Sequence, residues 1–70
     1  MEPRERFAEN LAARRRKAGL SQEALGFACG LHRTEVSLLE RAHREPRLST
    51  IVRLARGLRI RPAELLEGIE

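Results

Sequence analysis

The side chains with the greatest binding capacity in this sequence are arginines. The 70 residues include 14 lysines and arginines, of which only Lys17 is lysine, against 10 acids that are all glutamates. A guanidinium group donates in a fixed fork that fits two phosphate oxygens or the edge of a guanine. Seven arginines lie within 41–61, whereas 62–70 contains three glutamates and no basic residue. This asymmetry favours a polyanionic partner that contacts one face of the protein.

Segment 32–41 carries polar and basic side chains at the spacing of a helix. Val36 and Leu39 lie three residues apart and predict an apolar stripe that faces the interior. The residues that then fall mainly on the outward side are Arg33, Thr34, Ser37, Leu38 and Arg41. Polar side chains held on a rigid helix can hydrogen-bond to base edges or to phosphate oxygens. The chemistry that this segment offers is recognition of a nucleic acid.

Another short helix is expected directly before this segment. Ser21 is a good N-cap because its hydroxyl can accept a backbone N–H two or three residues on, and Gly30 can adopt the positive φ that ends a helix. The expected buried stripe between them is Leu25, Ala28 and Cys29. Crossing helices touch where side chains are small, so the helix at 32–41 should approach at Gly26. Two short helices joined by a tight turn form a helix-turn-helix.

The segment 21–41 resembles the helix-turn-helix of the lambda-repressor-like family of DNA-binding domains, also called the Cro or xenobiotic-response-element type. The residues that match the family pattern are Ser21, Gln22, Leu25, Gly26 in place of alanine, Gly30, Leu31, Val36, Ser37, Leu39 and Glu40. The resemblance extends from Leu11 to Leu66. It implies an all-α fold in which residues 1–70 form a single compact domain of five helices.

The segments that flank the motif predict the remaining three helices. The first is expected from Pro3 to Ala18, and the fourth has its cap at Ser49 or Thr50, with Leu48 anchoring the chain before it. The fifth is a short helix that begins at Pro62, contains Leu65 and Leu66 and is stopped by Gly68. No strand is expected, since alternating apolar and polar runs are absent. Ala42 stands where many relatives have glycine, so the helix at 32–41 either extends by a residue or ends in a different cap.

Glu40 is expected on the inner side of the second motif helix, beside Val36 and Leu39. A carboxylate in that position is costly unless it is paired. The resemblance implies its partner, because the family places an arginine four residues before the glycine that ends the first helix. In this sequence that residue is Arg15. The expected Arg15–Glu40 pair is structural in role.

The resemblance implies a sequence-specific DNA-binding regulator of transcription that acts as a homodimer. The helix at 32–41, called the recognition helix below, would lie in the major groove with Arg33, Thr34 and Ser37 nearest the bases. Leu38 could contact a thymine methyl or pack against a neighbour, and both interpretations stay open. The complete set of candidate DNA contacts is Gln22, His32, Arg33, Thr34, Ser37, Leu38, Arg41, Arg44 and Arg47.

Several kinds of small regulator share this pattern. The chain resembles controller proteins of restriction–modification systems, phage repressors or Cro proteins, and antitoxins that regulate their own operon. The controller type is favoured, and the sequence leaves the others open. An alternative class is an antitoxin or adaptor that binds a protein, with DNA binding secondary. The polar and basic outward face favours DNA, because an adaptor has no reason to keep it.

Apolar residues near the end of the chain exceed what one small domain can cover. Ile60, Leu66 and Ile69 are expected to form an exposed patch around the last helix, and such a patch usually marks an interface. The resemblance agrees, since stand-alone members often pair through this end. A two-fold axis there would separate the recognition helices by about 34 Å, which predicts an operator with inverted half-sites one DNA turn apart.

Other classes of function lack the residues they need. No paired carboxylates, catalytic triad or phosphate loop can be assembled, so no enzyme is expected. Cys29, His32 and His43 match no zinc spacing, so neither metal nor cofactor is expected, and no small-molecule ligand is evident. The single cysteine and the lack of a signal peptide or a membrane-spanning apolar run indicate a cytoplasmic protein without a membrane partner.

Overall fold

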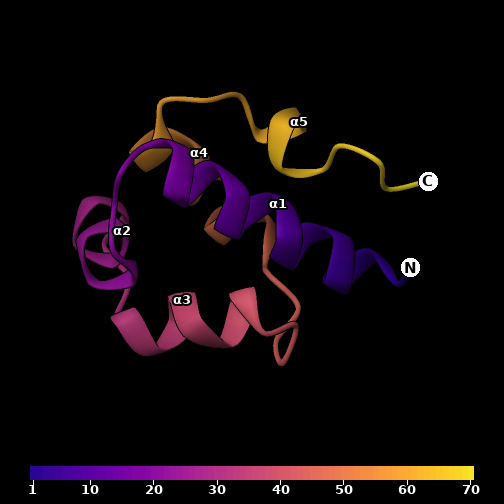
Figure 1. The fold of residues 1–70 in the computed structure, drawn as a ribbon, viewed down its shortest axis with the longest axis horizontal. Helices are drawn as coiled ribbons and strands as arrows, with labels where there is room; N and C mark the ends of the chain where they lie inside the picture. The colour runs from indigo at the N-terminus through magenta and orange to yellow at the C-terminus, as the bar shows by residue number, and fades with distance from the viewer.

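The computed structural model describes every residue from Met1 to Glu70. Its helices are α1 (Pro3–Lys17), α2 (Gln22–Cys29), α3 (Arg33–Glu40), α4 (Leu48–Leu58) and α5 (Pro62–Leu65), and it contains no strand (Figure 1). The expectation of an all-α fold with five helices is confirmed. None of these helices has the combination of length and apolar composition that crossing a membrane requires.

α1 runs through the middle of the fold and contacts other helices on two sides. α3 packs against one side of it and α5 against the other, while α2 packs against both α3 and α4 (Figure 1). Both chain termini lie at one end of the molecule, and the connection after α3 turns back at the same end. The main packing of α3 is therefore against α1 and α2, which leaves its opposite side free.

The core is one apolar cluster to which every helix contributes. Its buried members are Phe7, Leu11, Leu25, Cys29, Val36, Leu39, Leu54, Ala55, Leu58 and Leu65. Burying one large apolar side chain contributes roughly 1.5–3 kcal/mol to folding. A helix of only 8 residues such as α3 is unstable alone in water. The apolar stripe of Val36 and Leu39 is thus what fixes α3 to the rest of the protein.

α3 ends in a tight turn whose left-handed residue is Ala42. This residue has a φ of 58°. Its N–H donates to the carbonyl of Leu39 at 3.1 Å, and the N–H of His43 donates to the carbonyl of Leu38 at 2.9 Å. These are the two hydrogen bonds of a Schellman cap, in which glycine is the usual left-handed residue. The helix therefore stops at Glu40 and does not extend, and Ala42 adopts the conformation that glycine adopts without strain.

Three expectations about apolar and capping residues are wrong. Ala28 is exposed, because the buried face of α2 is centred on Leu25, Gly26 and Cys29. Leu48 is 77% exposed and is the first residue of α4, so it anchors nothing. The N-cap of α4 is Arg47, which makes no side-chain cap hydrogen bond, so Ser49 and Thr50 lie inside the first turn. An arginine carries only donors and cannot cap helix N–H groups.

The first and last helices are slightly shorter than expected. α1 ends at Lys17, with Ala18 as its C-cap. α5 is a single turn that ends at Leu65, with Leu66 as its C-cap. Gly68, at a φ of 80°, lies in a turn after the helix, in which the N–H of Ile69 donates to the carbonyl of Leu66 at 3.1 Å, and it does not itself terminate the helix.

Candidate nucleic-acid interface

α3 begins with a histidine cap. The Nδ1 atom of His32 accepts the backbone N–H of Thr34 at 3.0 Å. An accepting Nδ1 carries no proton, so the neutral ring holds its proton on Nε2 and can donate from there. His32 is exposed. The same side chain therefore satisfies the start of α3 and offers a donor to a partner on the solvent side.

The start of α3 lies directly against the backbone of α2. A Cβ atom built on Gly26 would come within 2.6 Å of the carbonyl oxygen of Leu31 and 3.3 Å of the amide nitrogen of Arg33. No real Cβ atom tolerates the first distance. The expected approach of the recognition helix at Gly26 is confirmed, and glycine here, where the family has alanine, lets the two helices lie closer together. Gly30 ends α2 with a φ of 71°.

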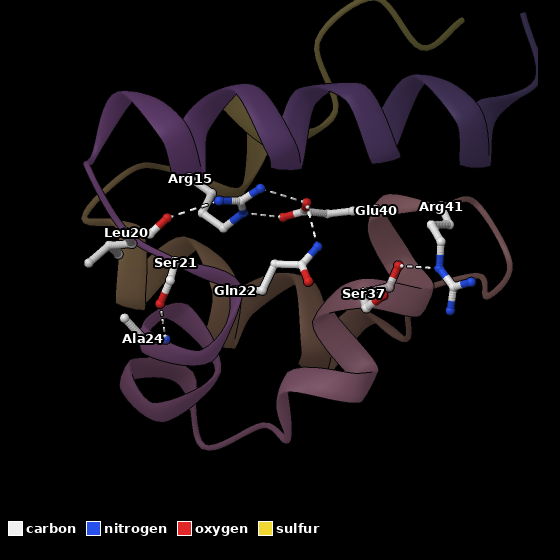
Figure 2. A network of polar contacts seen from close by, with 8 residues as sticks. All are labelled: Arg15, Leu20, Ser21, Gln22, Ala24, Ser37, Glu40 and Arg41. Atoms are coloured by element: carbon white, nitrogen blue, oxygen red, sulfur yellow. Dashed lines mark hydrogen bonds and ion pairs between the residues drawn. The ribbon is translucent and has the colours of Figure 1, made fainter.

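One buried carboxylate ties α1, α2 and α3 together. Arg15 of α1 donates from Nε to Oε2 of Glu40 at 2.6 Å and from Nη2 to Oε1 at 3.0 Å (Figure 2). Gln22 of α2 donates from Nε2 to the same Oε1 at 3.0 Å, and Arg15 also donates to the carbonyl of Leu20 at 2.9 Å. The Glu40 side chain is only 6% exposed.

This network is matched in charge and in hydrogen bonds. The hydrogen bond to Glu40 raises the pKa of the Arg15 guanidinium above its ordinary value, although burial acts in the opposite direction. The bidentate geometry fixes the direction of both side chains. Since Glu40 is the last residue of α3, the network holds the C-terminal end of this helix, as the contact at Gly26 holds its start.

The outward side of α3 carries the polar residues that the sequence placed there. Arg33, Thr34 and Arg41 are exposed, whereas Ser37 and Leu38 are half-buried. The Nε of Arg41 donates to the carbonyl of Ser37 at 3.4 Å, so its side chain folds back along the helix (Figure 2). Neither Arg33 nor Arg41 forms an ion pair with a glutamate. Both guanidinium groups are available to an anionic partner.

A polar hollow of about 460 Å³ lies between the start of α3 and the start of α4. Its charged and hydroxyl-bearing lining consists of His32, Glu35, Arg44, Glu45, Arg47, Ser49, Thr50 and Arg53. Arg44 is paired with Glu35, at 3.1 Å between Nη1 and Oε1. The structure thus brings Arg44 and Arg47 beside His32. Arg53 also belongs here, although its position in the sequence is that of a solvated residue on the outer side of a helix.

The three residues expected to form an apolar patch are only partly brought together. Leu66 and Ile69 line a groove of about 340 Å³ with Phe7 and Ile51. Ile60 does not line this groove and packs, half-buried, against the core. Leu66 is 40% exposed. The groove lies beside both chain ends, since Pro3, Arg4 and the connection at 45–46 complete its lining.

No group of three or more histidine, cysteine or acidic side chains is placed to hold a metal ion. Cys29 is buried against the backbone of Gly57, where a Cβ atom would collide with its sulfur. Burial raises the pKa of its thiol, with a smaller opposing effect of the hydrogen bond to Gly57. The thiol therefore acts as a small packing group between α2 and α4.

Known proteins share both this sequence pattern and this fold. The control protein C.BamHI of Bacillus amyloliquefaciens is 41% identical over 51 residues, which are 73% of this chain and 63% of that protein. The restriction-modification controller protein C.AhdI from Aeromonas hydrophila superposes with a TM-score of 0.87 at 42% identity, over 89% of this chain and 94% of that one. The P22 c2 repressor, solved in complex with a synthetic operator, superposes with a TM-score of 0.81 at 34% identity, over 89% of this chain and 94% of that one.

The family model of the helix-turn-helix matches residues 11–65. This range includes the buried network, the crossing at Gly26 and the outward face of α3. The chain therefore belongs to the helix-turn-helix family and is a DNA-binding regulator of transcription with the lambda-repressor-like fold.

Proposed function

We propose that this regulator is of the controller type and binds an operator with inverted half-sites as a homodimer, with α3 of each protomer in the major groove. Two controller proteins, C.BamHI and C.AhdI, support the type at 41% and 42% identity. The P22 c2 repressor, solved in complex with a synthetic operator, supports an operator as the partner. The place of action is the cytoplasm, and binding alone is the activity, without catalysis.

Arg33, Thr34 and Ser37 are the proposed readers of base edges. They lie within one turn and a half on the free side of α3, and the start of α3 lies directly against α2 at Gly26. A bidentate arginine discriminates guanine from other bases, and a hydroxyl can donate or accept. Leu38 follows on the same side and is half-buried, so its exposed part contacts a thymine methyl or a neighbouring apolar surface.

Phosphate contacts are assigned to residues around the base-reading face. These are Gln22, His32, Arg41, Arg44 and Arg47. The amide of Gln22 has two hydrogens, of which one goes to Glu40 and the other remains for a phosphate oxygen. His32 offers Nε2–H for the same purpose. Arg44 and Arg47 stand at the hollow beside the first turn of α4, whose positive end also favours an anion.

The observation that carries this proposal is the contrast between the two sides of α3. The inner side is held at both ends, by Gly26 and by the buried Arg15–Glu40 pair. The outer side bears the exposed residues Arg33, Thr34 and Arg41, and neither arginine has a glutamate partner. A protein-binding adaptor would need no such face, so the structure favours DNA over a protein partner.

Selection of bound DNA from a random pool, at about 50 mM and about 200 mM salt, tests this function. We expect one sequence to be enriched at both concentrations, as an inverted repeat whose half-site centres lie about 10 base pairs apart. The total amount of DNA that the protein retains should fall steeply at the higher salt, because binding to phosphates releases counterions and is therefore weakened by added salt. Arg56→Ala, which removes an exposed arginine of α4, should enrich the same sequence.

The possible contrary results separate the parts of the proposal. A pool without any enriched sequence would refute sequence-specific binding. Enrichment of isolated half-sites would preserve the role of α3 and remove the homodimer. A direct repeat would mean that the protomers follow one another along the DNA and are not related by a two-fold axis.

A further inference from the structure

Glu35 places a negative charge inside a hollow whose lining includes three arginines and one further glutamate, Glu45. The hollow contains the side chains of Arg44, Arg47 and Arg53 and lies beside the first turn of α4, whose N-cap makes no side-chain hydrogen bond. Glu35 is a residue of α3, and its side chain is 25% exposed. It binds the Nη1 atom of Arg44 at 3.1 Å. A phosphate that enters the hollow therefore meets a guanidinium that already has a carboxylate partner.

The two effects of this carboxylate on DNA binding have opposite signs. Its charge repels a phosphate, which weakens binding to every sequence. Its ion pair, a single contact between Oε1 and Nη1, also restricts the directions open to the guanidinium of Arg44, which lies on the loop that follows α3. Ordering a flexible arginine on binding costs conformational entropy. An arginine whose direction is already restricted avoids part of this cost, but only in the register on the DNA that places a phosphate in that direction.

We propose that Glu35 is a positioning residue that raises the preference for the operator over other DNA. It orients Arg44 for a single phosphate when α3 is in its specific register. In all other registers Arg44 finds no phosphate in that direction, and the carboxylate only repels the backbone. This inference rests on the proposed function, because it assigns Arg44 to the DNA interface.

Glu45 provides a matched control in the same hollow. It is a glutamate that also lines the hollow, but its side chain is 77% exposed and its nearest cation is Arg4, at 3.9 Å. It forms no ion pair with Arg44, whose carboxylate partner is Glu35. Removing its charge relieves the repulsion of phosphate without releasing Arg44, so it separates the electrostatic effect from the orienting effect.

The experiment measures the affinity for the selected operator and for an unrelated duplex of equal length, with wild type, Glu35→Gln, Glu35→Asp and Glu45→Gln. For Glu35→Gln we expect the affinity for unrelated DNA to rise by about threefold, on the order of one unit charge acting through water. Operator affinity should change by less than about twofold, because the lost orientation offsets the lost repulsion. The ratio of the two affinities then falls by about threefold.

The other variants should behave differently from Glu35→Gln. Glu35→Asp keeps the charge and shortens the reach, so operator affinity should fall while binding to unrelated DNA stays unchanged. Glu45→Gln should raise both affinities together and leave their ratio unchanged. Thermal unfolding of each variant gives the fraction folded, by which the affinities are corrected.

An unchanged ratio in Glu35→Gln, or an equal fall in Glu45→Gln, would overturn the inference while the DNA-binding function stands. A wild-type protein with no preference for any sequence would overturn both this inference and the proposed sequence-specific function. Glu35→Gln can also be tested in a protein that carries Arg44→Gln. If the ratio of the two affinities still falls there, Glu35 does not act through Arg44, and its role as a positioning residue is overturned as well.

Discussion

Arg15 and Glu40 lie 25 residues apart in the sequence and form a bidentate ion pair at 2.6 and 3.0 Å. Their side chains are 13% and 6% exposed, so the pair is shielded from water. Because Gln22 donates to the same carboxylate, three helices depend on one acceptor. A surface ion pair contributes little to stability, but removing one member of a buried pair leaves a charge without a partner.

Glu40→Ala should lower the free energy of unfolding by about 3–5 kcal/mol. Arg15 and Gln22 would lose their acceptor in a site with little access to water. The whole free energy of unfolding of such a domain is only about 5–15 kcal/mol, so the variant should be partly unfolded at moderate temperature. Chemical denaturation followed by circular dichroism measures the change.

The control for this variant is Glu67→Ala. Glu67 binds Arg14 at 3.2 Å, but its side chain is 64% exposed. Its removal should cost less than about 1 kcal/mol. If both variants lose the same small amount of stability, the Arg15–Glu40 pair is effectively solvated and cannot be what holds α3.

Ala42→Gly should stabilise the protein by about 0.5–1 kcal/mol. Ala42 has a φ of 58°, which strains an L-residue by about 1–2 kcal/mol, and part of the relief is offset by the greater freedom of glycine in the unfolded chain. Ala13→Gly is the matched control, because Ala13 is exposed within α1 and the change there should cost about 1 kcal/mol. Melting temperatures that shift in the same direction for both variants would contradict the strain at Ala42.

Most of the fold follows from local patterns in the sequence. Ser21 caps α2 and accepts the N–H of Ala24 at 3.0 Å, as its hydroxyl predicts, and the three-residue spacing of Val36 and Leu39 identifies the buried side of α3. The approach at Gly26 could be predicted because crossing helices touch where side chains are small, and glycine has none. These features depend on residues within one or two turns of each other.

The features that the sequence did not predict depend on how the helices and their connections are placed relative to one another. Leu48 is apolar but lies on a first turn that projects beyond the core, and Ala28 lies at the edge of its stripe. The pairing of Glu35 with Arg44 requires the path of the connection after α3, which Ala42 sets through a left-handed conformation that alanine rarely adopts. Arg53 likewise reaches the hollow only because α4 begins beside α3.

Arg33→Ala should weaken binding to the selected operator by about 1–3 kcal/mol and relax the preference at one base position of each half-site. The guanidinium is exposed in the first turn of α3 and has no glutamate partner, so its loss should not affect folding. Titration of operators that carry each single-base substitution measures the change. Arg56→Ala is the control for loss of one positive charge. If Arg33→Ala lowers the affinity for all sequences equally, Arg33 binds phosphate and another residue reads the base.

The homodimer is expected to form at the end of the molecule where the apolar groove lies. Leu66 and Ile69 line this groove with Phe7 and Ile51, and Leu66 is 40% exposed in the single chain. The two chain ends and the connection after α3 lie at the same end (Figure 1). A two-fold axis there places the α3 helices on one side of the pair. The molecule is 29 Å long, comparable with the roughly 34 Å turn that separates two half-sites.

Leu66→Glu should abolish a concentration-dependent dimer in sedimentation equilibrium and weaken operator binding, because a carboxylate would be buried without a partner in the interface. Phe27→Glu is the matched control. Phe27 is 91% exposed on α2, away from the groove, so the same apolar-to-acidic change there should leave the dimer intact. A wild-type monomer at protein concentrations at which the operator is bound, or a dimer that Phe27→Glu disrupts and Leu66→Glu does not, would move the interface from the groove to another face.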